Sequence, residues 1–195
     1  MSVDGISVTM ARGLVFAAIA LCVLSAEAAD LEGISMPDLR TVNGIPLRLN
    51  GIGLRTFSIF SVQIYVAGLY LERRSGDPET IIRSEQIKLL DIRFLRDVGA
   101  QDARNAWQES FDQNCTTPCY LDRMEVRQFL DAVPSVRKGD TAALLFSQSG
   151  LQVTFNGRLM GDITDQHFAK VILTTFIGPA PPTPRLKREL LGLRD

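Results

Sequence analysis

The chain has 195 residues, of which 46% are hydrophobic and 22% are charged, and its formal net charge is −1. This composition is that of an ordinary globular protein, so it excludes disordered, collagen-like and coiled-coil chains. The near-neutral charge gives no electrostatic basis for binding nucleic acid. The single histidine, His167, disfavours a multi-histidine metal site and histidine-based nucleophilic catalysis. We therefore expect no nucleic-acid partner and no metal.

The first 28 residues have the three-part pattern of a secretory signal peptide. Arg12 precedes an uncharged apolar run over 14–24, and small residues follow, with Ala26-x-Ala28 as the expected cleavage site. An uncleaved anchor is the alternative, but the run is shorter than the roughly 20 residues of a transmembrane helix. We expect residues 1–28 to be removed. Residues 29–195 should then form one periplasmic or secreted domain without a membrane span.

Removal of the signal peptide changes the cysteine count and the charge. Cys22 is lost, which leaves Cys115 and Cys119, and the remaining acidic and basic residues are equal in number. An exported chain with an even number of cysteines favours a structural disulfide. A redox-active pair is the alternative, although such pairs more often have two residues between the cysteines than three.

The first half of the mature chain has the patterns of β-strands. An extended lead-in or a hairpin with Asn43-Gly44 as its turn is expected over 30–50. Residues 54–71 are rich in β-branched and aromatic residues on both faces, which predicts a strand that is covered on both sides. A further strand over 87–97 alternates apolar residues with charged ones, which predicts one solvated face. The charged residues on that face are Asp91, Arg93 and Asp97.

The period then changes to that of helices. Apolar spacing predicts a helix over 103–111 and a second helix after the cysteine pair, with Asp122 and Glu125 as its capping box. A strand hairpin follows over 141–163, then a helix that starts at Thr164, and a short helix over 185–193. This order predicts an α+β fold in which helices pack on a largely antiparallel sheet.

Few residues have the pattern of a functional site. Gly51-Ile52-Gly53 lacks the third glycine and the following helix of a dinucleotide fingerprint, so we interpret it as a flexible turn before a strand. Arg55 comes two residues after Gly53, in a stretch that otherwise has a buried pattern. A guanidinium stays charged and offers a planar fork of donors. Arg55 therefore requires a surface position, a salt bridge or an anionic ligand.

Several segments of the mature chain have an order and spacing that resemble a known family. They are Leu49–Arg55, Val62–Glu72, Lys138-Gly139-Asp140, the hairpin over 150–161, and Phe168–Gly178 followed by Leu190-Leu191-Gly192. Together they are similar to the chalcone isomerase superfamily, and most of all to its exported bacterial chalcone isomerase-like branch. The resemblance implies an open-faced β-sandwich, in which a layer of helices covers a large antiparallel sheet and a ligand cleft lies between them.

The resemblance also implies roles for three side chains. In the enzymes, a strand-start arginine similar to Arg55 stabilises the oxyanion as a phenolate oxygen adds across an enone. In fatty-acid-binding relatives the same arginine holds a carboxylate. The hydroxyl of the last long helix matches Thr175, whereas Tyr65 stands where the enzymes have a threonine and Asp102 lies near their tyrosine position. The arginine is thus kept while the rest of the ring-closing set differs.

We therefore expect a non-catalytic protein that binds a small amphipathic acid, such as a fatty acid, through Arg55, Tyr65 and Thr175. The alternative is an isomerase, an intramolecular lyase of a chalcone or similar enone, in which the same three residues are catalytic. A second alternative is a structural or interaction role with an occluded cleft. None of these functions calls for a cofactor.

Overall fold

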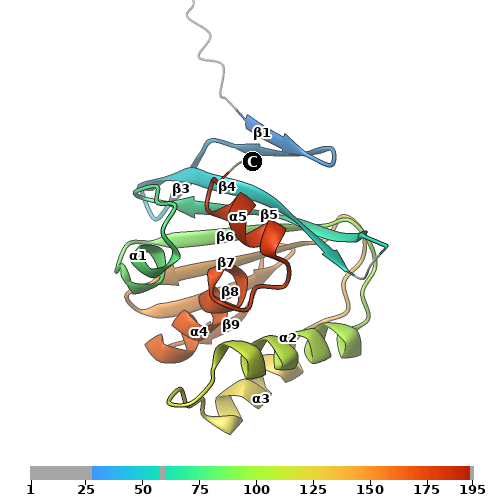
Figure 1. The fold of residues 1–195 in the computed structure, drawn as a ribbon, viewed down its shortest axis with the longest axis vertical. Coiled ribbons are helices and arrows are strands. Elements are labelled where there is room, and N and C mark those ends of the chain that lie inside the picture. The colour runs from blue at the N-terminus through green and yellow to red at the C-terminus, as the bar shows by residue number, and fades with distance from the viewer. Residues whose placement is uncertain (1–27, 58–59, 194–195) are drawn as a thin grey trace, which may run out of the picture.

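A curled antiparallel sheet forms the centre of the molecule (Figure 1). The computed structural model describes residues 28–57 and 60–193, so the predicted signal peptide lies outside the described residues except for Ala28. The seven strands of the sheet are neighbours in sequence order. They are β3 (Leu39–Val42), β4 (Ile45–Phe57), β5 (Val62–Leu71), β6 (Lys88–Phe94), β7 (Thr141–Ser147), β8 (Gly150–Phe155) and β9 (Arg158–Ile163).

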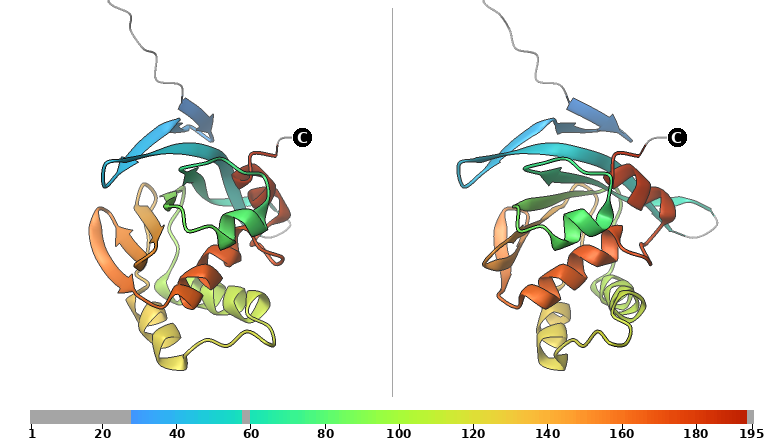
Figure 2. Two further views of the ribbon diagram at one scale, coloured as in Figure 1. Left: turned by 90° about the vertical axis from the view of Figure 1, so that its left-hand side faces the viewer. Right: turned by 60° about the vertical axis from the view of Figure 1, so that its left-hand side comes forward.

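Helices cover the concave side of this sheet, and a small hairpin covers part of the other side (Figure 2). The hairpin pairs β1 (Ala28–Leu31) with β2 (Ile34–Pro37). The helices are α1 (Pro78–Arg83), α2 (Ala100–Asn114), α3 (Arg123–Ala132), α4 (Gln166–Ile177) and α5 (Pro184–Leu190). The fold is therefore the predicted α+β arrangement of a large antiparallel sheet with a layer of helices. In the described part of the chain, no helix is long and apolar enough to cross a membrane.

Both faces of β5 are buried, as its apolar pattern predicts. Tyr65, Ala67 and Leu69 pack with α4 in the larger core, whereas Val66 and Tyr70 belong to a second core on the opposite face. The second core is completed by residues of β4 and the β1–β2 hairpin, such as Leu47, Leu49 and Met36. Alternate residues of one strand thus contribute to two separate cores.

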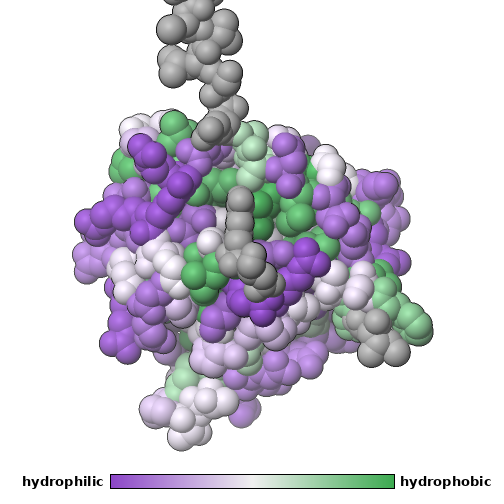
Figure 3. Space-filling view, turned by 45° about the horizontal axis from the view of Figure 1, so that its top comes forward, coloured by the Kyte–Doolittle hydropathy of each residue, from purple (hydrophilic) through white to green (hydrophobic). Residues whose placement is uncertain are grey.

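The single strand predicted over 54–71 is wrong, because two antiparallel strands occupy this stretch. Arg55 pairs with Tyr65, so the chain reverses between them. The reversal lacks the glycine or asparagine that usually marks a tight hairpin. Phe57 and Phe60 instead lie at its end, where Figure 3 shows hydrophobic side chains gathered on the surface; they are 63% and 82% exposed.

The predicted solvated face of β6 is also wrong in part. Asp91 is only 5% exposed, because it lies on the face of the sheet that the second core and the β1–β2 hairpin cover. Its carboxylate accepts a hydrogen bond of 2.8 Å from Arg40 on β3 and pairs with Arg93 on its own strand. A buried carboxylate requires such partners, and Arg40 lies 51 residues away in sequence.

The Gly51-Ile52-Gly53 segment lies within β4 and is not a turn. A Cβ at Gly51 would come within 2.0 Å of the carbonyl oxygen of Glu189, and one at Gly53 would touch Leu186. The glycines therefore let α5 pack directly on the backbone of β4. The Glu189 carboxylate also accepts a hydrogen bond of 2.8 Å from the Leu54 amide. This contact fixes β4 immediately before Arg55.

Most of the predicted helix signals are confirmed. Asp122 caps α3 by accepting hydrogen bonds from the amides of Met124 and Glu125. The last long helix is capped by Asp165 and not by Thr164. Cys115 and Cys119 form the predicted disulfide between α2 and α3.

Candidate functional site

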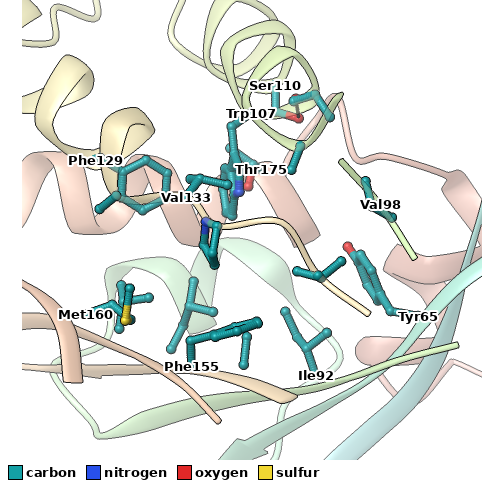
Figure 4. A pocket seen from close by; sticks show the side chains of 18 of the residues that line it. Tyr65, Ile92, Val98, Trp107, Ser110, Phe129, Val133, Phe155, Met160 and Thr175 are labelled. Carbon is teal, nitrogen blue, oxygen red and sulfur yellow. Dashed lines mark hydrogen bonds between the residues drawn. The ribbon is translucent and has the colours of Figure 1, made fainter. Parts of the chain in front are cut away.

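A cavity of about 1150 Å³ lies between the sheet and three helices (Figure 4). Its floor is formed by β5–β9, including Ile92 and Phe155, and α2, α3 and α4 form its roof. Several lining residues of α2 are exposed, such as Asp102 and Glu109, so the cavity opens to solvent beside this helix. The space next to Arg55 is therefore open, which argues against the occluded cleft of the second alternative.

Arg55 faces this cavity because of its register in the sheet. It is the cross-strand partner of Tyr65, and the two side chains share the face of the sheet that α4 covers. Leu54, one residue earlier, packs in the core on the opposite face. A β-bulge follows between Arg55 and Thr56 and shifts the register, so that Thr56 pairs with Gln63. The guanidinium of Arg55 is thus placed at one end of the cavity.

The ring of Tyr65 lies beside Arg55. The guanidinium carbon lies 5.9 Å from the centre of the Tyr65 ring, and the hydroxyl group points into the cavity (Figure 4). Burial raises the pKa of Tyr65, and the charge of Arg55 and a hydrogen bond with it act in the opposite direction. The phenol therefore stays protonated at neutral pH and is a donor for a ligand oxygen.

Thr175 also lines the cavity, from α4, but its hydroxyl already has a partner. Its Oγ1 donates a hydrogen bond of 2.7 Å to the carbonyl oxygen of Ile172, and the residue is 1% exposed. The structure thus brings together all three residues singled out in the sequence, Arg55, Tyr65 and Thr175, around one cavity. Arg55 and Tyr65 form a pair, whereas the Thr175 hydroxyl is bonded within its own helix.

An aromatic cluster in the roof was not predicted as part of the site. Trp107 of α2 contacts Phe129 of α3 and Phe176 of α4, with ring centres 5.0 and 5.7 Å apart. Phe168 completes this wall through edge contacts with Phe129. Helical spacing placed Trp107 and Phe129 on the inner faces of their helices. It gave no sign that these faces border a cavity, because that depends on how far the helices stand from the sheet.

Polar groups lie on the α3 side of the cavity as well. Burial raises the pKa of Glu125, and the neighbouring carboxylates of Asp165 and Asp122 raise it further. Glu125 is among the lining residues. A carboxylate ligand would be repelled by these groups and attracted by Arg55. The electrostatics thus favour one orientation of an acidic ligand.

The fold and the cavity define an α+β protein with a small-molecule-sized space between an antiparallel sheet and its helical layer. The model of the chalcone isomerase-like family matches residues 28–192, so the chain belongs to this family. A search of curated proteins found no match.

The fold is also similar to a solved structure, the fatty-acid binding protein of Arabidopsis thaliana. The TM-score is 0.70 at 18% sequence identity, over 85% of this chain and 96% of the plant protein. At this identity the likeness concerns the fold.

Proposed function

We propose that the protein binds a small amphipathic acid, such as a fatty acid, in the cavity, with the carboxylate held by Arg55. The observation that carries the proposal is the pairing of Arg55 and Tyr65 at one end of a large cavity with an aromatic roof. A structural neighbour described as a fatty-acid binding protein supports it. Thr175 would contribute mainly its methyl group, because its hydroxyl is already bonded.

The two ends of an amphipathic acid would be bound by different forces. A half-buried guanidinium binds a carboxylate through charge-assisted, bidentate hydrogen bonds, and the Tyr65 hydroxyl can donate to the same group. The hydrocarbon tail would lie along Ile92, Trp107 and Phe129, where each buried methylene contributes about 0.8 kcal/mol. Charge would determine orientation, and tail burial would supply most of the affinity.

The proposal includes a periplasmic or secreted location after removal of residues 1–28. The signal-like pattern of that segment and the Cys115–Cys119 disulfide support it, since such bonds persist in oxidising compartments. Amino-terminal sequencing of protein from the periplasmic or culture fraction would test it, with Ala29 as the expected first residue.

The ligand proposal is tested by comparing two arginine variants of β4. Arg55→Gln removes the charge in the cavity, whereas Arg48→Gln removes an exposed charge that does not line it. We expect Arg55→Gln to weaken the binding of a fluorescent fatty acid by about 10- to 100-fold, because hydrogen bonds to charged groups contribute about 1.5–3 kcal/mol. Arg48→Gln should bind as wild type does.

Organic extraction and native mass spectrometry of the purified protein give an independent readout. We expect a bound acid in wild type and a reduced amount in Arg55→Gln. The proposal is wrong if wild type carries no ligand and fatty acids bind Arg55→Gln as tightly as wild type.

The second candidate, an isomerase of a chalcone or similar enone, is favoured by the Tyr65 phenol beside Arg55. This pair could stabilise an oxyanion at the wall of the cavity. A chalcone absorbance assay decides it. Ring closure faster than the spontaneous reaction in wild type, and lost in Arg55→Gln, would establish the enzyme, whereas an unchanged rate rejects that substrate.

A further inference from the structure

A group of metal-binding side chains lies at the start of α4, and none of its members lines the cavity. Sγ of Cys115, Sγ of Cys119 and a ring nitrogen of His167 all lie within 4.8 Å of one another. Sγ of Cys119 lies 3.4 Å from Nε2 of His167. His167 is exposed and both cysteines are partly buried, so solvent reaches the group from one side.

Three local features place these atoms. Cys115 ends α2, and its amide donates to the carbonyl oxygen of Phe111. The following turn is closed by a hydrogen bond of 2.8 Å from the Cys119 amide to the carbonyl of Thr116. Asp165 caps α4 and so fixes His167 in its first turn. The imidazole is therefore held beside the disulfide by an element that is 48 residues away in sequence.

We propose that reduction of the Cys115–Cys119 disulfide converts this group into a binding site for one thiophilic d10 ion, Cu⁺ or Zn²⁺. A dithiol reductant supplies the two electrons and two protons that turn the disulfide into two thiols, and is itself oxidised to a disulfide. The ion then displaces both thiol protons and is bound by two thiolates and the neutral imidazole. The expectation of no metal rests on the presence of a single histidine. A site with two thiolate ligands needs only one histidine, so that expectation does not apply to it.

The ligand set and its spacing fit these ions. Thiolates select Cu⁺ and Zn²⁺, and imidazole suits both. Zn–S bonds of about 2.3 Å in tetrahedral geometry place two sulfurs about 3.8 Å apart. The two Cα atoms are 5.0 Å apart, and the three residues between the cysteines are exposed, so the sulfurs have room to separate. Three protein ligands leave one zinc position open, or complete a trigonal Cu⁺ site.

The surroundings favour a bound cation. The carboxylates of Asp165, Asp122 and Glu125 interact with one another at the starts of α3 and α4. They add negative potential near the cluster, and this favours a bound cation.

The test uses the full chain with Cys22→Ser, so that the third cysteine does not contribute. The protein is reduced under anaerobic conditions and titrated with Zn²⁺ against a chromogenic zinc chelator, and with Cu⁺ against a chromogenic copper chelator. The two titrations distinguish the ions. We expect one equivalent of at least one ion to bind to reduced protein. Co²⁺ serves as a spectroscopic probe of the zinc arm, and a thiolate-to-cobalt charge-transfer band is expected.

Variants separate the proposed site from adventitious binding. Loss of a residue that only orients a metal ligand weakens binding about 10- to 100-fold, so loss of the ligand itself in His167→Ala should weaken it at least as much. This variant should no longer compete with the chelator for one equivalent of the ion. Cys115→Ser with Cys119→Ser should remove binding, whereas Lys170→Gln, on an exposed position of the same helix, should leave it unchanged. Circular dichroism of each reduced variant checks the fold.

The proposal is overturned if reduced protein binds neither ion more tightly than the double cysteine variant. It is also overturned if His167→Ala binds as tightly as the parent protein. Should the reduced protein unfold, circular dichroism with and without each ion replaces the titration. No ion-dependent recovery of the folded spectrum would then reject the site. None of these outcomes depends on fatty-acid binding.

Discussion

Lys88 is a cation in an unfavourable position, at the start of β6. It is 5% exposed, and its Nζ donates hydrogen bonds of 2.6 and 3.1 Å to the carbonyl oxygens of Ser84 and Gln86. Burial lowers the pKa of Lys88 to about 8, and the positive charge of Lys170 lowers it too, whereas Glu72 acts in the opposite direction. The folded state therefore releases the proton of Lys88 at a lower pH than the unfolded state does.

We expect this side chain to make folding stability rise with pH between about 8 and 10.5. Below this range Lys88 is protonated in both states, and above it the group is neutral in both. Within the range the unfolded chain binds more protons, so the free energy of unfolding increases with pH. Urea unfolding of wild type and Lys88→Met across this range measures the effect, and Lys88→Met should lose this contribution to the slope.

Lys170→Gln provides the control for the cause of the shift. It removes one repulsive charge, so the pKa of Lys88 should move upwards and the rise in stability should begin at a higher pH. A Lys88→Met protein with the same pH slope as wild type would contradict the assignment. The slope is the informative quantity, because loss of the two Nζ hydrogen bonds also changes the stability of Lys88→Met, and this change does not depend on pH in the same way.

At the scale of residues, the sequence was sufficient to single out Arg55 but not to orient it. Its context is unusual for a charged side chain, and that is visible in the sequence. The face of the sheet on which the Arg55 side chain lies depends on the cross-strand pair with Tyr65 and on two irregularities in β4, near Gly51 and Thr56. A shift of one residue in register would turn the guanidinium away from the cavity. Asp91 was misplaced for a similar reason, because its partner Arg40 is distant in sequence.

At the scale of elements, the contact between β4 and α5 sets the position of the strand that carries Arg55. Asn50 donates a hydrogen bond of 2.9 Å to the carbonyl oxygen of Leu190, and the Leu54 amide bonds to Glu189. Glu189 in turn pairs with Arg185 one turn earlier. The absence of a side chain at Gly51 allows this close approach.

Gly51→Ala should therefore destabilise the fold by about 1–3 kcal/mol or more, since overpacking in a close contact forces the backbone to move. The added Cβ would lie 2.0 Å from one backbone oxygen and 2.8 Å from another, so α5 must shift. Chemical denaturation measures the loss. Gly161→Ala is the matched control in β9, where a Cβ meets nothing within 4 Å, and should change stability little. Equal stabilities of the two variants would contradict this account of the glycines.

The same contact shows where prediction of elements fails. Helices were recognised because their period and capping residues are local, as at Asp122. The β4–β5 hairpin was missed because its reversal has Ser61 at φ 50° and no glycine or asparagine nearby to signal it. Gly51-Ile52-Gly53 was interpreted as a turn, since a sequence contains no sign that a helix 135 residues later will pack on that backbone.

At the scale of the whole molecule, the cavity arises because helices α2 and α3 stand away from the floor of the sheet. Ala142 of β7 lies in the middle of this floor, between its cross-strand partners Ile92 and Phe155. All three line the cavity. No local pattern predicts such a space, because it depends on the joint placement of sheet, roof and connecting loops. The small side chain at Ala142 leaves room that a larger one would fill.

If the cavity holds the tail of an acid, affinity should depend on chain length in wild type and be limited in Ala142→Leu. Each additional methylene buried by wild type should increase affinity about fourfold, corresponding to about 0.8 kcal/mol, until the cavity is filled. Ala142→Leu should weaken the longest bound acids about 15-fold, the equivalent of about two buried methylenes. Short acids serve as the internal control and should bind both proteins equally. Calorimetry over a series of acids measures this dependence, and a parallel loss for short and long acids would mean that the tail does not lie over Ala142.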